Sequence, residues 1–360
     1  MNGSPTVAVL IATYNRAQRL GETLDVLAGS CIDPSLSWEV VVVDNNSTDA
    51  TREVVTSRQA TYPVPLRYIF EHRQGRSSAL NTAIAATTAP LLLFTDDDVR
   101  VDPVWVTAGT HALLAGADYV GGPVRPIWES DPPPWLDLTR TDLWGTIAIL
   151  DYGASPFAFE DRQRVPLGAN MGVRRSLIAA VGDFRIDLGR SSGRRLLGQE
   201  VPELLARARA TGLHGEYVPA MAVDHHIPAQ RLTKRYFRRW WVGKGYSKGL
   251  FEAVQPMTEL GLDLRRVPHI CGIPRYVIGD AIRDALAYVV AAIRRDAGER
   301  FRREMRLAYF IGFVRARAFR GRPAYAAPDT SAPSHPGPPA PPDPRTPARR
   351  TPHTSDLAIR

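Results

Sequence analysis

The sequence contains very little cysteine, only Cys31 and Cys271 in 360 residues. Two cysteines cannot form the disulfide framework of a small secreted domain, and such low usage is typical of a reducing cytoplasm. The chain also lacks any run approaching the roughly 20 apolar residues that a membrane-spanning helix needs. Its beginning, MNGSPTVAVLIATYNR, lacks the basic start of a secretory signal and turns polar after a short apolar run. These absences predict a cytoplasmic protein without spanning segments.

The composition is that of a globular protein whose charge is unevenly distributed. With 44% hydrophobic residues, the chain can bury a large core and has room for two subdomains. The net charge is +8, and arginine is concentrated between residues 231 and 320. This asymmetry favours an acidic partner for the C-terminal part, such as an anionic membrane surface.

The first third of the chain alternates short apolar runs with helical patterns. We expect strands in TVAVLIATYN, WEVVVVD, LRYIFE and PLLLFTD, with amphipathic helices between them. Near-continuous Val, Ile and Leu strands that alternate with helices predict an α/β fold, with a parallel sheet covered on both faces. Further along, 167–173 is expected to form a strand, 200–212 a helix and 215–226 a pair of short strands.

Unusual polar residues follow three of these strands. The segments are Thr13-Tyr14-Asn15-Arg16, Asp44-Asn45-Asn46-Ser47 and Asp96-Asp97-Asp98. In a parallel sheet, ligands bind beyond the carboxyl ends of the strands, so we expect these side chains to gather along one rim.

The presence of three adjacent carboxylates in Asp96–Asp98 requires an explanation, because each like-charged neighbour makes the next ionisation harder. The triplet could be a solvated turn, but the cap of the next helix is already supplied by Asp102, which Pro103 follows. Two carboxylates separated by one residue suit Mg²⁺ or Mn²⁺, which in turn can hold a diphosphate. The triplet therefore predicts a divalent metal site.

Other candidate residues each have a structural alternative. Asp44 could cap a turn, or accept a hydrogen bond from a ribose or base. Glu200 could be a first-turn acid that favours the helix dipole, or a general base that projects into a cleft. His225 and His226 are adjacent at the end of a predicted strand, so their rings lie on opposite faces and at most one can reach the site.

The stretch RYFRRWW, residues 235–241, interleaves arginine with aromatic residues. It could be a nucleic-acid patch, a helix at a membrane surface or a platform on which a sugar ring stacks. Because no recognised nucleic-acid motif accompanies it, we expect no nucleic-acid partner.

Taken in order, six segments resemble the family 2 glycosyltransferases of the GT-A fold. They are VAVLIATYNR, WEVVVVDNNSTDAT, GRSSALNTAI, LLLFTDDDV, LGANMGVRR and GQEVPEL, and they cover about residues 6–226. The resemblance implies inverting transfer of a sugar from a nucleotide-diphosphate donor, with a divalent cation, Mn²⁺ or Mg²⁺. It also implies a nucleotide-diphosphate sugar and a saccharide or lipid-linked acceptor as partners.

The same resemblance implies roles for individual residues. Glu200 falls at the catalytic base. Asp98 is the expected direct metal ligand, with Asp96 beside it and His226 as a further candidate. The donor nucleotide site would contain Thr13, Tyr14, Asn15, Arg16, Asp44, Asn46, Arg76, Asn81, Asp96 and Asp97. The acceptor side would contain Asn170, Arg239 and Trp240.

Two departures from the family pattern matter. The usual acidic pair before the catalytic helix is Gln199-Glu200 here. The processive members carry Gln-X-X-Arg-Trp followed by membrane spans, whereas this chain has Tyr236 at the first position and no spans. We therefore expect a non-processive enzyme that adds one sugar, in bacterial surface polysaccharide or glycolipid assembly.

Two other functions compete with this interpretation. A nucleotidyltransferase also uses paired carboxylates and metal, but ATYNRAQRL lacks the glycine-rich loop that it would need. A non-catalytic protein that binds nucleotide sugars or membranes is the second alternative, against which the acidic triplet and Glu200 argue.

The expected organisation has three parts. Residues 1–226 form the catalytic domain, with an insertion or flap at about 122–166. Residues 227–320 form a basic, aromatic region with amphipathic helices. Residues 321–360 hold 11 prolines and almost no large apolar side chains, which predicts a disordered tail. The basic region would place the protein peripherally on the inner face of the plasma membrane.

Overall fold

The computed structural model describes residues 4–159, 164–188, 198–254, 258 and 262–320. The tail that the sequence predicts to be disordered, 321–360, lies outside the described residues.

The central sheet has eight strands in the order β3-β2-β1-β4-β9-β6-β10-β8. Its strands are β1 (Val7–Thr13), β2 (Trp38–Asp44), β3 (Leu66–Phe70), β4 (Leu91–Thr95), β6 (Tyr119–Gly121), β8 (Phe157–Ala158), β9 (Asn170–Arg174) and β10 (Gly215–Tyr217). Strands β3, β2, β1 and β4 are parallel, as the sequence predicts. Strand β9 runs antiparallel to both β4 and β6, so the sheet is mixed.

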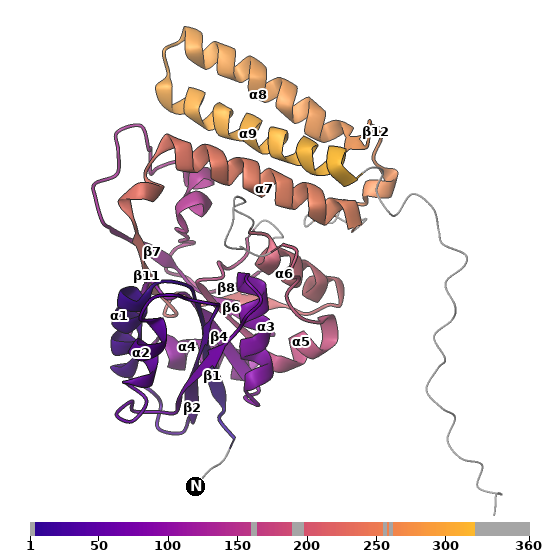
Figure 1. Ribbon diagram of the computed structural model, residues 1–360. Helices are drawn as coiled ribbons and strands as arrows, with labels where there is room; N and C mark the ends of the chain where they lie inside the picture. Colours follow the sequence, from indigo (N-terminus) through magenta and orange to yellow (C-terminus); the bar gives the residue numbers. More distant parts are fainter. Residues whose placement is uncertain (1–3, 160–163, 189–197, 255–257, 259–261, 321–360) are drawn as a thin grey trace, which may run out of the picture. The chain divides into compact units, whose positions relative to one another are not determined.

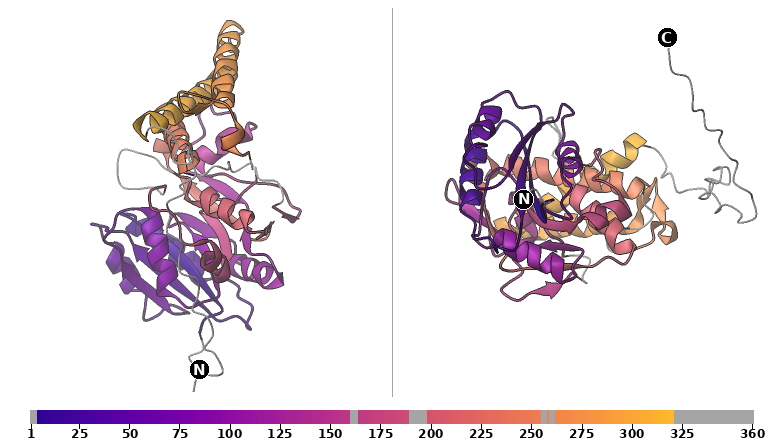
Figure 2. Two further views of the ribbon diagram at one scale, coloured as in Figure 1. Left: turned by 90° about the vertical axis from the view of Figure 1, so that its right-hand side faces the viewer. Right: turned by 90° about the horizontal axis from the view of Figure 1, so that it is seen from below.

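Helices cover both faces of this sheet (Figures 1 and 2). They are α1 (Ala17–Ala28), α2 (Thr51–Thr56), α3 (Arg76–Ala86), α4 (Trp105–Ala115), α5 (Arg175–Val181) and α6 (Glu200–Ala210). Every residue of β2 and β4 is buried, which explains their continuous apolar sequences. Asp102 accepts a hydrogen bond from the backbone N–H of Val104, and α4 begins one residue later, at Trp105.

A second, three-stranded sheet has the order β5-β11-β7. Its strands are β5 (Val99–Val101), β7 (Val124–Trp128) and β11 (Val223–Ile227). The two short strands expected in 215–226 are present as β10 and β11, but they do not pair with each other, because β10 joins the central sheet and β11 joins this small one. Strand β5 directly follows the acidic triplet, and its pairing with β11 sets His225 opposite Val99. The small sheet thus brings the histidine pair to the triplet.

The C-terminal region is helical. It contains α7 (Lys234–Val254), α8 (Arg275–Ile293) and α9 (Ala297–Arg320), the short 3-10 helices η2 (Ala229–Arg231) and η3 (Leu264–Arg266), and the hairpin strands β12 (His269–Ile270) and β13 (Ile273–Pro274). Among the described residues, no helix combines the length and the apolar character needed to cross a bilayer.

The segment 122–166 contributes strand β7 and a 3-10 helix, η1 (Thr141–Ile147). This helix packs against α7 in a hydrophobic cluster that also includes Phe301 and Met305 of α9. Trp241 Nε1 donates a hydrogen bond of 3.0 Å to Thr146 Oγ1 within this contact. The segment therefore ties the C-terminal helices to the strands of the small sheet.

Candidate functional site

The carboxyl ends of β1 and β4 meet at the acidic triplet. The Thr13 hydroxyl donates a 2.8 Å hydrogen bond to Asp97 Oδ2, and Arg16 Nη1 lies 3.2 Å from Asp97 Oδ1. The same guanidinium nitrogen also contacts Asp98 Oδ2. Thr13 stands in register with Asp44 at the end of β2. Polar residues from three strand ends therefore lie along one rim.

Asp96, Asp98 and His225 form a cluster that could hold a metal ion. One ligand atom from each lies within 4.8 Å of the others. His225 Nε2 is 3.4 Å from Asp98 Oδ1, and both side chains are almost completely buried. Two carboxylates and an imidazole are ligands that Mn²⁺ accepts, and Mg²⁺ binds the carboxylates. The donor set therefore fits a divalent cation.

His226, the histidine named from the sequence, points away from the triplet. Its Nε2 lies 3.9 Å from Glu22 Oε2. Burial and the charges of Arg19 and Arg100 lower its pKa. Neighbouring side chains on a strand face opposite sides, so the pairing of β11 with β5 decides which ring faces the carboxylates. The structure thus replaces His226 with His225 as the candidate ligand.

Arg76 joins the candidate metal-binding cluster to Glu200. Its Nη2 donates to Asp96 Oδ1 at 2.8 Å, and its Nη1 donates to Glu200 Oε1 at 3.2 Å. The guanidinium also donates to the Gly168 carbonyl oxygen at 2.9 Å. A Cβ atom at Gly168 would lie 2.8 Å from Arg76 Nη1, so only glycine leaves room for this arrangement.

Glu200 is the first residue of α6 and is only 6% exposed. Its Oε1 is held by Arg76, whereas Oε2 is buried and has no hydrogen-bond partner among the residues that the structure describes. A buried carboxylate oxygen without a donor is costly unless a ligand supplies one. This oxygen can therefore accept a proton or hydrogen bond from a bound molecule.

The carboxylates of the triplet differ in their proton affinity. Burial, reinforced by the neighbouring Asp98 charge, raises the pKa of Asp97 to about 7, although Arg16 opposes the shift. Burial acts on Asp98 in the same sense, but hydrogen bonding to His225 and the charges of His225, Arg16 and Arg231 hold its pKa well below the usual range. Burial also opposes ionisation of Asp96, but the charge of Arg76 outweighs this effect and lowers the pKa of Asp96. The two candidate metal ligands are thus the ones that stay ionised.

Arg231 is a site residue that the sequence analysis did not identify. Its Nη2 lies 4.0 Å from Asp98 Oδ2, and its Nη1 lies 3.5 Å from His225 Nε2. It belongs to η2, which follows β11 after one residue. Its closeness in the sequence to His225 and His226 is the feature that could have indicated its place in the site.

The two loops that follow β1 and β2 are hydrogen-bonded to each other. The Asn15 backbone N–H donates to Ser47 Oγ at 2.8 Å, and Asn15 Oδ1 accepts from the Thr48 N–H at 2.7 Å. Asp44 accepts from the Ser47 N–H and from the Tyr68 hydroxyl, both at 2.8 Å. Tyr14 and Asn46 are exposed on these loops. The expected nucleotide residues of β1 and β2 therefore form one connected rim.

Two expected site residues make structural hydrogen bonds. Asn170 is fully buried, donates to the carbonyl oxygens of Pro123 and Met221, and accepts from Trp105 Nε1. All of these groups belong to the protein interior, so the structure contradicts its place on the acceptor side. Asn81 exchanges two hydrogen bonds with the backbone of Phe184, which occupies both ends of its amide. This pairing gives Asn81 a structural role, and its contact with the nucleotide stays a prediction.

Arg239 and Trp240 lie on α7. Trp240 is partly buried in the cluster between α7 and η1, and the Lys244 ammonium lies 5.2 Å from its ring centroid. Arg239 is exposed. The packing explains Trp240 without a ligand.

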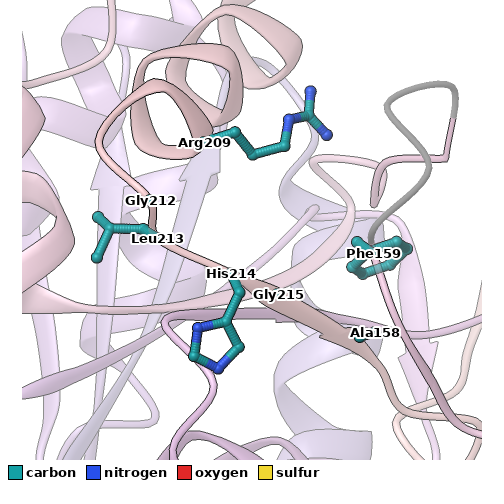
Figure 3. A pocket seen from close by; sticks show the side chains of 7 residues that line it. All are labelled: Ala158, Phe159, Arg209, Gly212, Leu213, His214 and Gly215. Carbon is teal, nitrogen blue, oxygen red and sulfur yellow. The ribbon is translucent and has the colours of Figure 1, made fainter.

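A separate cavity of about 210 Å³ lies at the start of β10 (Figure 3). It is lined by Ala158, Phe159, Arg209, Gly212, Leu213, His214 and Gly215. None of the expected site residues contributes to it, and it lies at the amino end of β10. The carboxylate cluster, at the carboxyl ends of the strands, is therefore the better candidate site.

Comparison with known proteins gives a consistent result. Residues 8–182 match the family model "Glycosyl transferase family 2". Glycosyltransferase AglE of Haloferax volcanii is 32% identical over 122 residues, which are 34% of this chain and 40% of that protein. Validoxylamine A glucosyltransferase of Streptomyces hygroscopicus subsp. limoneus is 34% identical over 166 residues, 45% of this chain and 36% of that protein. The matched stretch thus spans well under half the length of these two relatives.

Among solved structures, a mannosyltransferase from Pyrobaculum calidifontis in complex with GDP-Man and Mn²⁺ is similar over most of the chain. The TM-score is 0.54 at 19% identity, and the match covers 88% of each chain. At this identity the likeness shows the fold, which is the mixed α/β GT-A fold.

Proposed function

Residues 8–182 belong to glycosyl transferase family 2, and from this premise we propose that the chain transfers a sugar from a nucleotide-diphosphate donor to an acceptor hydroxyl, with inversion. The observation that carries the proposal is the buried, unpartnered Oε2 of Glu200, whose other oxygen is linked through Arg76 to the carboxylate cluster. A base and a diphosphate site thus lie on either side of one guanidinium.

Asp96, Asp98 and His225 are the residues that would hold a divalent cation, Mn²⁺ or Mg²⁺. When bound, such a cation neutralises the diphosphate and stabilises the charge that grows on it as the glycosidic bond breaks. The basic groups beside Asp98, Arg16 and Arg231, are within reach of phosphate oxygens in the same place.

The nucleoside would lie along the rim built by β1 and β2. In this proposal Asp44 receives hydrogen bonds from the ribose or base, and Thr13, Tyr14, Asn15 and Asn46 surround it. The hydrogen bonds between the two loops support the proposal, because they hold the rim in one conformation without the ligand.

Glu200 acts as the general base in this proposal. Arg76 holds Oε1, so Oε2 is left to take the proton from the acceptor hydroxyl as that oxygen attacks the anomeric carbon. The attack comes from the face opposite the leaving diphosphate, so the configuration inverts. One base and a stabilised leaving group suffice, and no covalent sugar–enzyme intermediate is required.

The proposed acceptor is a saccharide or a lipid-linked saccharide, and the proposed setting is assembly of a bacterial surface polysaccharide or glycolipid. The departure at Tyr236 from the processive motif supports addition of a single sugar. The basic C-terminal helices support peripheral attachment to an anionic membrane, on its cytoplasmic face.

Release of nucleoside diphosphate from a panel of nucleotide sugars, with and without Mn²⁺, tests the proposal. We expect one donor to be turned over only with the metal, and Asp98→Asn to lose metal-dependent donor binding in calorimetry. Equal binding of nucleoside diphosphate and Mn²⁺ by the wild type and Asp98→Asn would remove the metal site. Release of pyrophosphate from a nucleoside triphosphate in the presence of a sugar 1-phosphate would instead indicate a nucleotidyltransferase.

A further inference from the structure

Helix α8 exposes a continuous face of large aliphatic side chains. Its members are 46% to 77% exposed: Ile282, Leu286, Val289, Val290 and Ile293. Their spacing of four, three, one and three residues places them on one side of a helix. We call this set the α8 apolar face.

The opposite side of α8 packs against α9 (Figure 1). Ala281 and Ala291 are buried there, and buried Asp284 pairs with Arg303 and Arg306 at 2.7 Å each. One side of α8 is thus buried against α9, and the α8 apolar face remains exposed to solvent.

The other two long helices of this region differ from α8, because large apolar side chains of both are buried. Helix α9 lies between α7 and α8, and its Phe313 and Met305 are buried. On α7, Phe237 and Trp241 are buried as well. Five of the 14 large hydrophobic residues that are exposed in the described part of the chain lie on the α8 apolar face, whereas the others are distributed over many elements. A contiguous patch of this kind marks an interaction surface.

The net charge at the two ends of the face is positive. Exposed arginines lie at both ends of α8, Arg275 at its start and Arg294 and Arg295 at its end. The two acids of α8 lie off the face: Asp284 is buried, and Asp280 pairs with Arg283. Residues 275–320 contain 11 arginines and five acidic residues. An apolar face bordered by arginine is typical of a helix that lies in the headgroup layer of an anionic bilayer.

We propose that α8 docks the protein on an anionic lipid surface, with the α8 apolar face inserted among the lipids and the terminal arginines on their headgroups. A second copy of the chain fits this face less well. Two copies that met there, in either direction, would bring helix ends of net positive charge together, because Asp296 offsets only one of the two arginines beside it.

This inference rests on the proposed function in one respect only, that a lipid-linked acceptor would be available at the surface where α8 docks. Binding itself requires neither donor nor metal. The two proposals can therefore fail separately.

Flotation of the full chain with vesicles tests the inference. The vesicles contain phosphatidylcholine alone or phosphatidylcholine with phosphatidylglycerol. We expect the wild type to float with the anionic vesicles at low salt, and the double variant Leu286→Gln/Ile293→Gln to lose roughly 100-fold in partition coefficient, because two aliphatic side chains no longer insert. The matched control is Leu114→Gln, which changes a residue that is 54% exposed on α4 and should float like the wild type.

Three results would overturn the inference. The wild type could fail to float, the double variant could float as well as the wild type, or light scattering could show that the double variant converts a dimer into a monomer. Circular dichroism of both variants checks that they are folded, which is expected because both positions are exposed. Donor hydrolysis without vesicles should be the same in the wild type and the double variant, and its absence from both would count against the proposed function alone.

Discussion

Gly168 lies where any side chain would meet the guanidinium that joins two carboxylates of the site. A Cβ atom there would be 2.8 Å from Arg76 Nη1, and Arg76 contacts both Asp96 and Glu200. The backbone at Gly168 thus acts on the chemistry through Arg76.

We therefore predict that Gly168→Ala displaces the Arg76 guanidinium and lowers turnover by about 10- to 100-fold, since small misplacements of catalytic groups have effects of that size. The fold should survive, because the atoms that must move belong to the end of a flexible side chain. Steady-state kinetics with thermal melts measures both. Gly29→Ala, at the end of α1, is the control, and wild-type turnover in Gly168→Ala would contradict the role given to Arg76.

Asn170 illustrates a residue whose family motif suggested the site and whose surroundings are the core. Its side chain makes three hydrogen bonds to buried groups. We predict that Asn170→Ala lowers the free energy of unfolding by about 3 kcal/mol or more, because an indole N–H and two carbonyl oxygens lose their partner. Urea denaturation measures the loss. A stable Asn170→Ala protein with a raised KM for the acceptor would instead restore the acceptor-side role.

At the scale of elements, the pairing of β11 with β5 brings a histidine to the carboxylates. His225 faces Asp98, whereas His226 faces Glu22. We predict that His225→Ala weakens Mn²⁺ binding in the presence of nucleoside diphosphate by about 10- to 100-fold, by loss of a ligand. His226→Ala, the adjacent residue on the same strand, is the matched control and should bind as the wild type does. If calorimetry showed that His226→Ala weakens Mn²⁺ binding and His225→Ala does not, the register of the small sheet would be wrong.

The sequence predicts the part of the site that depends on local pattern. Parallel strands end at a common edge, so the convergence of Thr13, Asp44 and Asp98 follows from the strand and helix periods alone. The antiparallel β9 and the β5–β11 pair could not be predicted, because such pairings join segments more than 70 residues apart in the chain. The contact of Arg76 with Glu200 could not be predicted for the same reason, since 124 residues separate them.

The triplet shows what the sequence alone could not predict about charge. Its like charges suggested that a divalent cation would offset them. The structure also surrounds Asp98 with Arg16, His225 and Arg231, which come from three different segments. Compensation of a buried charge depends on tertiary contacts, so it cannot be inferred from the acidic residues themselves.

On the scale of the whole molecule, the chain combines a large α/β core with a second hydrophobic cluster that joins the segment 122–166 to α7 and α9. The expected boundary at residue 226 remains a prediction. What the arrangement brings together is a carboxylate cluster, Glu200 as the proposed base and a basic helical region with one exposed apolar face.

The proposed sugar transfer depends most directly on Glu200, and conversion of this residue to Gln tests its role as the base. Glu200→Gln keeps the shape and the hydrogen bond to Arg76 but cannot take the acceptor's proton. We predict unchanged donor affinity in calorimetry and turnover reduced by roughly 10²–10⁴. Glu203→Gln, which alters another first-turn acid of α6 that pairs with Arg207, should change stability and leave turnover near the wild-type value. Normal turnover in Glu200→Gln would contradict the account.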